Sequence, residues 1–393
     1  MGSQAQHNGT PTFDWIDEVA AARSAAGLQR TLRTRGVEES ALDLAGNDYL
    51  GLARDKRVSS AAASAALRWG VGATGSRLVT GTTEVHTELE RALAAFVGAQ
   101  AALVFSSGFL ANLGAVTALA DANTAVVADR YIHASLIDGC RLSRAQVAVA
   151  EHCSPSAVGE ALASRKLERA LVVTDSVFSV DGDLAPLGEL ARLCREHGAG
   201  LLVDDAHGFG VRGTGGVGAV AEAGLSSAHD VVTTITLSKA LGGQGGAVLG
   251  PRRVIEHLAN AARSFMFDTA LAPASAAAAL AALKIMQAEP DRGAAAVEIA
   301  CRIADELRAS GLRASRPSSA VVALLAPSAE AALRWVADAR ARGILVGCFR
   351  PPSAPGTISR VRVSVRADLT ETEVARAIEV LRATAPQMPE RAG

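Results

Sequence analysis

One lysine of the 393-residue chain stands in an unusual setting. Lys239 is the only charged side chain of the stretch TTITLSKALGGQGG, residues 233–246, whose last five positions (242–246) hold four glycines. A buried lysine is costly unless it is paired or takes part in chemistry. Three explanations are open at this point: a phosphate-binding loop, a surface lysine at a helix start, and a lysine that forms an imine.

Other polar side chains follow runs of apolar residues that are typical of strands. His133 comes after TAVVA (124–128), Ser179 after ALVVT (170–174), and Asp204, Asp205 and His207 at the end of GLLVDD (200–205). The turn Ser107–Gly108–Phe109 likewise follows AALVF (101–105). In open α/β sheets, ligands bind at the carboxyl ends of the strands. Each residue alone has a structural explanation, such as a hydrogen-bonded histidine or a helix cap, but together they favour one shared crevice.

Two nucleotide-binding motifs and a metal site are disfavoured. Lys239 is followed by alanine and lacks the glycine spacing of a P-loop. The stretch GTGGVG (213–218) matches GxGxxG in letters, but it lies eight residues past a strand and opens no clear strand-to-helix turn. A metal could be imagined among Asp204, Asp205, His207 and His133, yet no HExxH or comparable spacing supports it, so we expect no metal.

Imine chemistry with an aromatic aldehyde cofactor has four requirements, and this chain meets them. A lysine must become neutral, a carboxylate must hold a pyridine nitrogen protonated, a flat group must cover the ring, and an anion cradle must hold a phosphate. Lys239, Asp204, His133 and the Gly108–Phe109 turn with Thr236 fill these roles in that order. The sequence therefore predicts pyridoxal 5'-phosphate as the cofactor.

The elements that must position these residues are those of an α/β protein. Short apolar runs alternate with helical stretches such as 111–120, 154–165 and 186–198, which predicts a mainly parallel sheet flanked by helices. An N-terminal helix is expected over 15–33. After about residue 290 strands and helices follow in another succession. We predict an N-terminal helical arm with a short strand segment (1–55), a large cofactor-binding domain (56–290) and a small α+β domain (291–393).

Composition excludes some classes of partner. A net charge of −1 and a pI near 6.7 give no basic face for nucleic acid or for an anionic membrane. No apolar run is long enough to span a bilayer, and the first ten residues lack the plan of a signal peptide. Five scattered cysteines without a CxxC pair suit a reducing compartment. We expect a cytoplasmic enzyme.

Eight segments, in order, give the chain a family resemblance from about Trp15 to its last helix. It resembles the α-oxoamine synthases, which are pyridoxal-phosphate-dependent transferases of fold type I. The matching segments are NDYLGL (47–52), GATGSRLVTGTTEVHTELE (72–90), FSSGFLANLG (105–114), HASLIDG (133–139), TDSVFSVDGDLAPL (174–187), VDDAHGFGVRG (203–213), TLSKALGGQGG (236–246) and RPPSAPGTISRVRVS (350–364).

The resemblance implies a role for each matching residue. Lys239, Asp204 and His133 would be catalytic, and His133 would also stack on the cofactor ring and contact substrate. His207 and Ser179 would bond the phenolic oxygen of the cofactor. Gly108, Phe109 and Thr236 would hold the phosphate, and Thr269 would reach the phosphate of a neighbouring subunit, which implies a homodimer. Four residues would contact substrate, with the last as the clamp for the amino-acid carboxylate: Arg30, Asn47, Ser353 and Arg362.

The segments GSRLVTGT and TLSKALGGQGG are most similar to the branch of the family that joins L-alanine to a pimeloyl thioester, with loss of CO2, in biotin biosynthesis. CoA and acyl-carrier protein both stay open as the acyl carrier. The leading alternative is glycine C-acetyltransferase. An alternative of a different class is a non-catalytic relative that binds an acyl thioester and leaves Lys239 unused.

Overall fold

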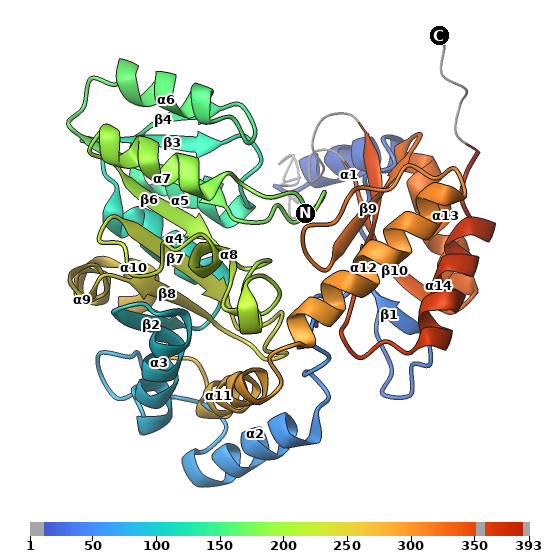
Figure 1. The fold of residues 1–393 in the computed structure, drawn as a ribbon, viewed down its shortest axis with the longest axis horizontal. Coiled ribbons are helices and arrows are strands. Elements are labelled where there is room, and N and C mark those ends of the chain that lie inside the picture. Colours follow the sequence, from blue (N-terminus) through green and yellow to red (C-terminus); the bar gives the residue numbers. More distant parts are fainter. Residues whose placement is uncertain (1–11, 351–357, 388–393) are drawn as a thin grey trace, which may run out of the picture.

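A seven-stranded sheet forms the centre of the larger part of the protein (Figure 1), seen in a computed structural model that describes residues 12–350 and 358–387. Its spatial order is β2-β8-β7-β6-β5-β3-β4, and β8 alone runs antiparallel to its neighbours. The strands are β2 (Ala101–Phe105), β3 (Thr124–Asp129), β4 (Gln146–Ala150), β5 (Arg169–Asp175), β6 (Gly200–Asp204), β7 (Val231–Thr236) and β8 (Gly246–Gly250). The mainly parallel sheet predicted from the sequence is confirmed.

Helices cover both faces of this sheet (Figure 1), which explains why its central strands are apolar on both sides. One face packs against α4 (Gly108–Leu119), α5 (Ala134–Ser143), α9 (Arg252–Ala261) and α10 (Arg263–Met266). The other packs against α6 (Pro155–Ser164), α7 (Leu187–Glu196) and the short α8 (Ala219–Glu222). Beside β2 and β8 lies α3 (Glu84–Val97), which packs against α11 (Pro273–Ala288), and α11 in turn packs against α2 (Lys56–Trp69).

A second sheet of four strands, in the order β1-β10-β11-β9, lies beside the first (Figure 1). It consists of β1 (Leu42–Leu44), β9 (Val321–Ala326), β10 (Ile344–Phe349) and β11 (Ser359–Ser364). Its helices are α12 (Arg292–Ala309), α13 (Ala329–Ala341) and α14 (Glu371–Ala383). β1 pairs in parallel with β10, so the segment before α2 contributes a strand to the sheet built mostly from the C-terminal third. One apolar core joins the two parts, since it contains residues such as Tyr49, Phe209 and Val321.

The N-terminal helix is shorter than the sequence predicts. α1 runs only from Trp15 to Ala25, not to residue 33, and buries none of its residues. Gly27 follows with a φ of +64°, the left-handed conformation that commonly ends a helix. Apolar spacing over 28–33 does not extend the helix because this segment has no buried face to pack against.

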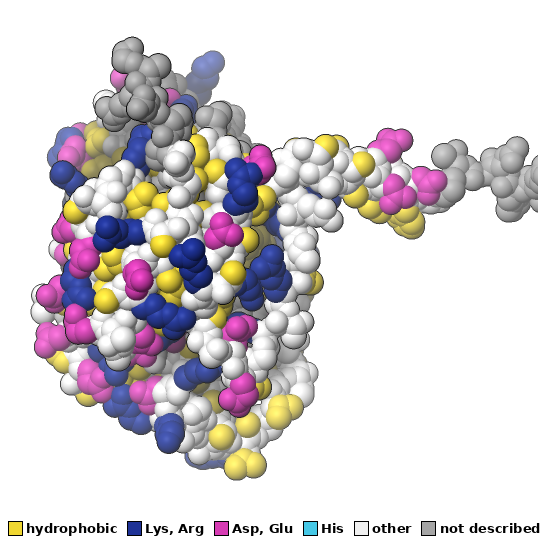
Figure 2. Space-filling view, turned by 90° about the vertical axis from the view of Figure 1, so that its right-hand side faces the viewer, with side chains coloured by type: hydrophobic (Ala, Val, Ile, Leu, Met, Phe, Trp, Pro, Cys, Tyr) yellow, Lys and Arg dark blue, Asp and Glu magenta, His cyan; other side chains and the backbone are white. Residues whose placement is uncertain are grey.

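The surface carries charges of both signs. On the face shown in Figure 2, Lys and Arg are interspersed with Asp and Glu and do not gather into a basic patch. Among the residues that the structure describes, no helix combines the length and the apolar character that crossing a membrane requires.

Candidate active site

Lys239, Asp204 and His133 come together at the carboxyl edge of the large sheet. Asp204 ends β6, Lys239 follows β7, and His133 caps the start of α5 after β3. Lys239 is half-buried among these groups. Burial lowers the pKa of its amine to about 8; Arg362 acts in the same direction, whereas Asp204 and Asp175 oppose it. A lysine in this setting has a substantial neutral fraction near physiological pH, which imine formation requires.

Asp204 is held by a helix on one face of the sheet. Asn112, in α4, donates from Nδ2 to Oδ2 of Asp204 at 2.6 Å, and the N–H of Ala206 donates to Oδ1 at 2.9 Å. The Asn112 amide oxygen accepts from Thr234 Oγ1 at 2.5 Å. The carboxylate is therefore buried but fixed in orientation, as a partner for a pyridine nitrogen must be. Sequence reasoning missed Asn112, whose only signal is an amide side chain in a mainly apolar helix.

A second buried carboxylate, Asp175, lies beside Asp204. The two residues are paired in register across β5 and β6, and Oδ1 of Asp175 accepts from the backbone N–H of His133 at 3.1 Å. Burial, reinforced by the charge of Asp204, raises the pKa of Asp175 well above its ordinary value. Asp175 thus fixes the backbone of His133 and so helps to position its imidazole. It was not among the residues predicted from the sequence.

The two histidines near this edge are held in different ways. His133 Nδ1 contacts Ser135 Oγ at 2.7 Å, and the His133 ring meets the ring of Phe109 edge-on at 6.5 Å. Desolvation lowers the pKa of His133, Asp204 opposes this, and Lys239 adds to it. His207 is 5% exposed, and its Nδ1 lies 2.5 Å from Oη of Tyr49. Burial, with the charges of Lys239, Arg362 and His133, lowers the pKa of His207 well below its ordinary value, so its imidazole is neutral.

The first turn of α4 forms a close-fitting cradle. Ser107 caps the helix by accepting from the N–H of Leu110 at 3.2 Å, and the first turn of a helix leaves N–H groups free for an anion. A Cβ placed on Gly108 would lie 3.0 Å from Cβ and 3.1 Å from Oγ1 of Thr236. The Gly108 backbone and the Thr236 hydroxyl therefore face each other closely at a helix N-terminus. This arrangement suits a phosphate, which accepts from both N–H and hydroxyl donors.

Arg362 brings the small sheet into the same space. Its guanidinium donates from Nη1 to the carbonyl of Ser179 and from Nη2 to Oδ1 of Asn47, each at 2.9 Å. It also lies over the ring of Phe349, 4.5 Å from the ring centroid. The charge is 5% exposed, and no carboxylate pairs with it among the residues that the structure describes. A buried, unpaired arginine of this kind fits the carboxylate of a small ligand.

The remaining predicted residues lie further out or outside the described part. Thr269 is exposed in the loop after α10, beside Asp268, which accepts from Ser106 Oγ. Arg30 is exposed in the segment between α1 and β1. Ser353 lies outside the described residues. Arg350, at the end of β10, donates to the carbonyl of Gly27.

Arg360, in the same strand as Arg362, is held in an ion pair. Its guanidinium pairs with both carboxylate oxygens of Asp181, at 2.9 and 3.1 Å. β11 is covered on both sides, because Val361 and Val363 face the core while Arg362 and Ser364 are buried on the other face. Alternation along a strand shows which residues share a face, but it does not show that a neighbouring loop covers that face.

Two other groups of titratable residues, around His152 and around Asp205, do not form a reactive site. Both ring nitrogens of His152 hydrogen-bond carboxylates, Nδ1 to Asp129 at 2.9 Å and Nε2 to Asp183 at 2.7 Å. Although partial burial opposes it, these bonds raise the pKa of His152 to about 12, so the cluster that it forms with Cys153 is an ion-paired imidazolium.

Asp205 turns away from Asp204 to Ser176 Oγ, at 2.5 Å, and to the N–H of Ala219, so the imagined cluster with His207 is not assembled.

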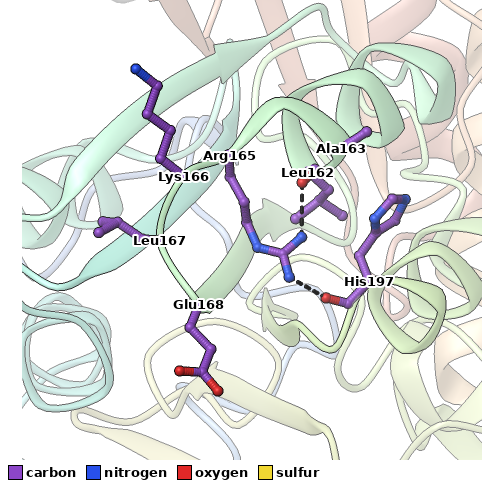
Figure 3. A pocket seen from close by; sticks show the side chains of 7 residues that line it. All are labelled: Leu162, Ala163, Arg165, Lys166, Leu167, Glu168 and His197. Atoms are coloured by element: carbon purple, nitrogen blue, oxygen red, sulfur yellow. Dashed lines mark hydrogen bonds between the residues drawn. The ribbon is translucent and has the colours of Figure 1, made fainter.

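A surface hollow at the opposite edge of the sheet is shown in Figure 3. It lies where α6 leads into β5, and Arg165 occupies it with its guanidinium bonded to the carbonyls of Leu162 and His197. Lys166 and Glu168 point away from that guanidinium. Arg165 thus hydrogen-bonds the C-terminal ends of α6 and α7. The hollow has no side chain placed for catalysis.

Fold and site together define a pyridoxal-phosphate enzyme of fold type I. The chain belongs to the aminotransferase class I and II family, whose model matches residues 39–381, and within it to the α-oxoamine synthases. Pyridoxal 5'-phosphate is its cofactor. The structure fits this group, since it presents a fixed buried carboxylate, a lysine of lowered pKa and a helix N-terminus at one edge.

Relatives with assigned names show which enzymes of the family the chain is similar to. The chain is 54% identical to the 8-amino-7-oxononanoate synthase of Mycolicibacterium gilvum over 373 residues, covering 95% of this chain and 97% of that protein. It is 52% identical to the enzyme of the same name from Mycobacterium tuberculosis, over 96% of this chain and 97% of that protein.

Solved structures agree on the fold. A serine palmitoyltransferase from S. paucimobilis with a bound PLP–myriocin aldimine matches with a TM-score of 0.88 at 28% identity, over 95% of this chain and 97% of that chain. An 8-amino-7-oxononanoate synthase from Francisella tularensis matches with a TM-score of 0.76 at 28% identity, over 88% and 98%.

Proposed function

We propose that this chain condenses L-alanine with a pimeloyl thioester to give 8-amino-7-oxononanoate, CO2 and the free thiol, the reaction for which its relatives of 52–54% identity are named. The observation that carries the proposal is the meeting of Lys239, Asp204 and Arg362 at one sheet edge. The serine palmitoyltransferase structures share the fold at only 28% identity, so they do not favour serine over alanine.

The cofactor, when bound, supplies an aldehyde for the amino group and an electron-withdrawing ring that stabilises negative charge at Cα. In the proposed arrangement, Asp204 holds the pyridine nitrogen protonated. His133 covers the ring, and His207 and Ser179 bond its phenolic oxygen. Gly108, Phe109 and Thr236 bind the phosphate. The orientation of Asp204 by Asn112 supports the first of these roles.

Lys239 and Arg362 handle the substrate in this proposal. The neutral amine of Lys239 takes the proton from Cα of alanine, for which a pKa of about 8 is well matched. Arg362 and Asn47 hold the alanine carboxylate until it leaves as CO2, and Arg30 and Ser353 contact substrate. His133 polarises the thioester carbonyl while the Cα–C bond forms and the thiol departs. The proton that Lys239 takes leaves with the thiol, and Cα gains one proton from solvent after CO2 is lost, so the acyl group has replaced the carboxyl group on Cα.

We further propose a homodimer in which Thr269 of one subunit reaches the phosphate site of the other, and a cytoplasmic location. The exposure of Thr269 supports the first, together with exposed apolar side chains at Leu78, Val79 and Phe267. The scattered cysteines support the second. CoA and acyl-carrier protein both fit as the carrier of the pimeloyl group.

The decisive experiment incubates the holoenzyme with alanine, glycine or serine, each with pimeloyl-CoA, pimeloyl-acyl-carrier protein, acetyl-CoA or palmitoyl-CoA, and identifies products by mass. The expected product is 8-amino-7-oxononanoate from alanine and a pimeloyl thioester. A product from glycine and acetyl-CoA alone would establish glycine C-acetyltransferase instead. Acyl-thioester binding with no product from any pair would establish a non-catalytic relative.

A further inference from the structure

Tyr49, one of only two tyrosines in the chain, is buried between the two parts of the site. Its side chain is 0% exposed. Its hydroxyl oxygen lies 2.5 Å from Nδ1 of His207 and 3.2 Å from Oδ1 of Asn47. Burial also raises the pKa of the phenol, with Arg362 opposing the rise, so the hydroxyl keeps its proton. A phenol has a single proton to donate, and two acceptors compete for it.

The surroundings of the two acceptors indicate where the proton goes. Asn47 Oδ1 already accepts from Arg362 Nη2 at 2.9 Å. His207 Nδ1 is the nearer atom, and His207 is neutral, so one of its two nitrogens must be an acceptor. The tautomer of a histidine is set by the hydrogen bond that its other nitrogen makes. Donation from Tyr49 to Nδ1 leaves the proton of His207 on Nε2.

Nε2 has no hydrogen-bond partner among the residues that the structure describes, although the ring is 5% exposed. Nε2 is not fully enclosed, because the buried side-chain atoms that lack a partner do not include it. It therefore borders open space within the site, where a ligand can accept its hydrogen bond. Under the proposed function, that partner is the phenolic oxygen of the cofactor. A donor is required there, because this oxygen is anionic when the ring is poised for chemistry.

We propose that Tyr49 is a positioning residue that fixes His207 as the Nε2–H tautomer and so makes it a hydrogen-bond donor to the phenolic oxygen of the cofactor. This deepens the proposed function and rests on it for the identity of the oxygen. The charged and titratable groups that act on His207 are Lys239, Arg362 and His133, besides Tyr49 itself. Tyr49 is the one that contacts Nδ1.

The tautomer can be measured directly on the unmutated holoenzyme without any substrate. In protein labelled with ¹⁵N-histidine, with His207 assigned through His207→Gln, the resonances between pH 7 and 9 should show Nε2 protonated and Nδ1 unprotonated. A protonated Nδ1 would overturn the proposal, because the hydrogen bond to Tyr49 would then run the other way.

A matched pair of variants tests the consequence. Tyr49→Phe keeps the shape and removes the donor, and Tyr131→Phe removes the other phenol of the chain, whose ring lies beside that of His152. In Tyr49→Phe, the pH midpoint of the visible absorbance of the bound cofactor should rise by about half to one unit, since the ionised phenolic oxygen loses a fixed donor. Tyr131→Phe should leave the midpoint at the parent value.

The ¹⁵N measurement and the absorbance midpoint distinguish a positioning role of Tyr49 from a merely structural one. They also test the tautomer independently of the proposed reaction. A midpoint unchanged in Tyr49→Phe, at any thermal stability, would contradict the proposal. If Tyr49→Phe fails to fold, the ¹⁵N measurement still decides. Neither measurement uses an amino acid or a thioester, so the tautomer can be established even if product analysis rejects the proposed substrates, and it can fail while they are accepted.

Discussion

At the scale of single residues, the site is organised by how each charge is compensated. Lys239 is desolvated and feels Asp204, Asp175 and Arg362, and burial prevails to lower its pKa to about 8 from 10.5. Burial, and then the charge of Asp204, raises the pKa of Asp175. Opposite displacements of neighbouring acids and bases are typical of active sites, because each group must titrate near the working pH.

The pKa of Lys239 predicts a pH dependence for cofactor capture. Only the neutral amine attacks an aldehyde, so for cofactor-free protein the rate of capture should rise about tenfold per pH unit below pH 8 and level off above it. An ordinary lysine would continue to gain up to pH 10.5. Stopped-flow absorbance with pyridoxal 5'-phosphate between pH 6.5 and 10 would measure the profile.

Lys239→Ala is the control for this experiment. It should bind the cofactor only reversibly, with no borohydride-fixed adduct and no product formation. Adduct at another lysine, or a rate in the parent protein that climbs steadily past pH 9, would show that Lys239 is not the amine with the lowered pKa.

The clamp predicted for alanine depends on Arg362. Arg362→Leu should weaken alanine affinity by about 30- to 1000-fold, or about 2–4 kcal/mol, since a charge pair in a nearly dry site is lost. Alanine titration of the holoenzyme, followed by absorbance, measures this. Arg360→Leu is the matched control from the same strand, and it should stay within about fivefold of the parent, because a partly exposed ion pair contributes about 1 kcal/mol or less. Parent-like alanine binding in both variants would place the clamp elsewhere, with Arg350 as the next residue to test.

At the scale of elements, the cradle at the start of α4 depends on a missing side chain. Gly108→Ala would place a Cβ 3.0 Å from Cβ of Thr236, tighter than ordinary packing. Overpacking of this kind costs about 1–3 kcal/mol, so cofactor affinity should fall by about 5- to 160-fold. Equilibrium dialysis of the cofactor gives the constant.

Gly188→Ala in α7 is the comparison for Gly108→Ala. Nothing lies within 4 Å of a Cβ at that position. It should leave cofactor affinity unchanged and raise the free energy of unfolding by up to about 1 kcal/mol, because alanine is the better helix former. Equal loss of cofactor affinity in both variants would mean that the cradle is not at Gly108.

Helices and strands could be predicted from the sequence where burial of the element itself produces a run or spacing of apolar residues. Strands β2, β3, β5 and β6 fall on the predicted apolar runs because their neighbours on both faces are helices. β4 was missed, since four of its five residues are exposed and it has no buried run to detect. The length of α1 was wrong because helical spacing counts only where a surface exists to pack on.

The same limit applies to the site. Gly108, Asp204 and Lys239 lie next to strand ends, so topology alone brings them together. Asn112 lies within α4 and Tyr49 in the turn after β1, and Tyr49 meets His207 across 158 positions of sequence, so no local pattern connects them. Such supporting residues are found from coordinates, because their role is defined by the distance between side chains.

At the scale of the whole molecule, the site lies between the two sheets. Asp204 and Lys239 come from the large sheet, whereas Arg362 comes from β11 and Asn47 from the segment after β1. Arg362 bonds the carbonyl of Ser179, and Arg360 pairs with Asp181, so the loop after β5 is tied to the small sheet at two points. A shift of one part relative to the other would move Arg362 away from Lys239.

The proposed homodimer predicts that two inactive chains can complement each other. Thr269→Glu would put a negative charge beside the phosphate of the neighbouring subunit and repel it, while Lys239→Ala removes the amine within its own subunit. In a hybrid of the two, one site combines Lys239 of the first chain with Thr269 of the second and is intact. Random mixing of the two variants should therefore restore about a quarter of the parent activity, since half the dimers are hybrids with one working site of two.

Refolding the two variants together from denaturant, at equal concentrations, would make the hybrids, and product formation would be compared with each variant refolded alone. Each variant alone should be inactive, and the recovered activity should fall on dilution if the subunits dissociate. Activity that stays at the sum of the separate variants, in a mixture shown to be dimeric by sedimentation, would confine the site to one chain. Thr269 would then be an ordinary surface residue, and its exposure beside Asp268 would need no partner subunit to explain it.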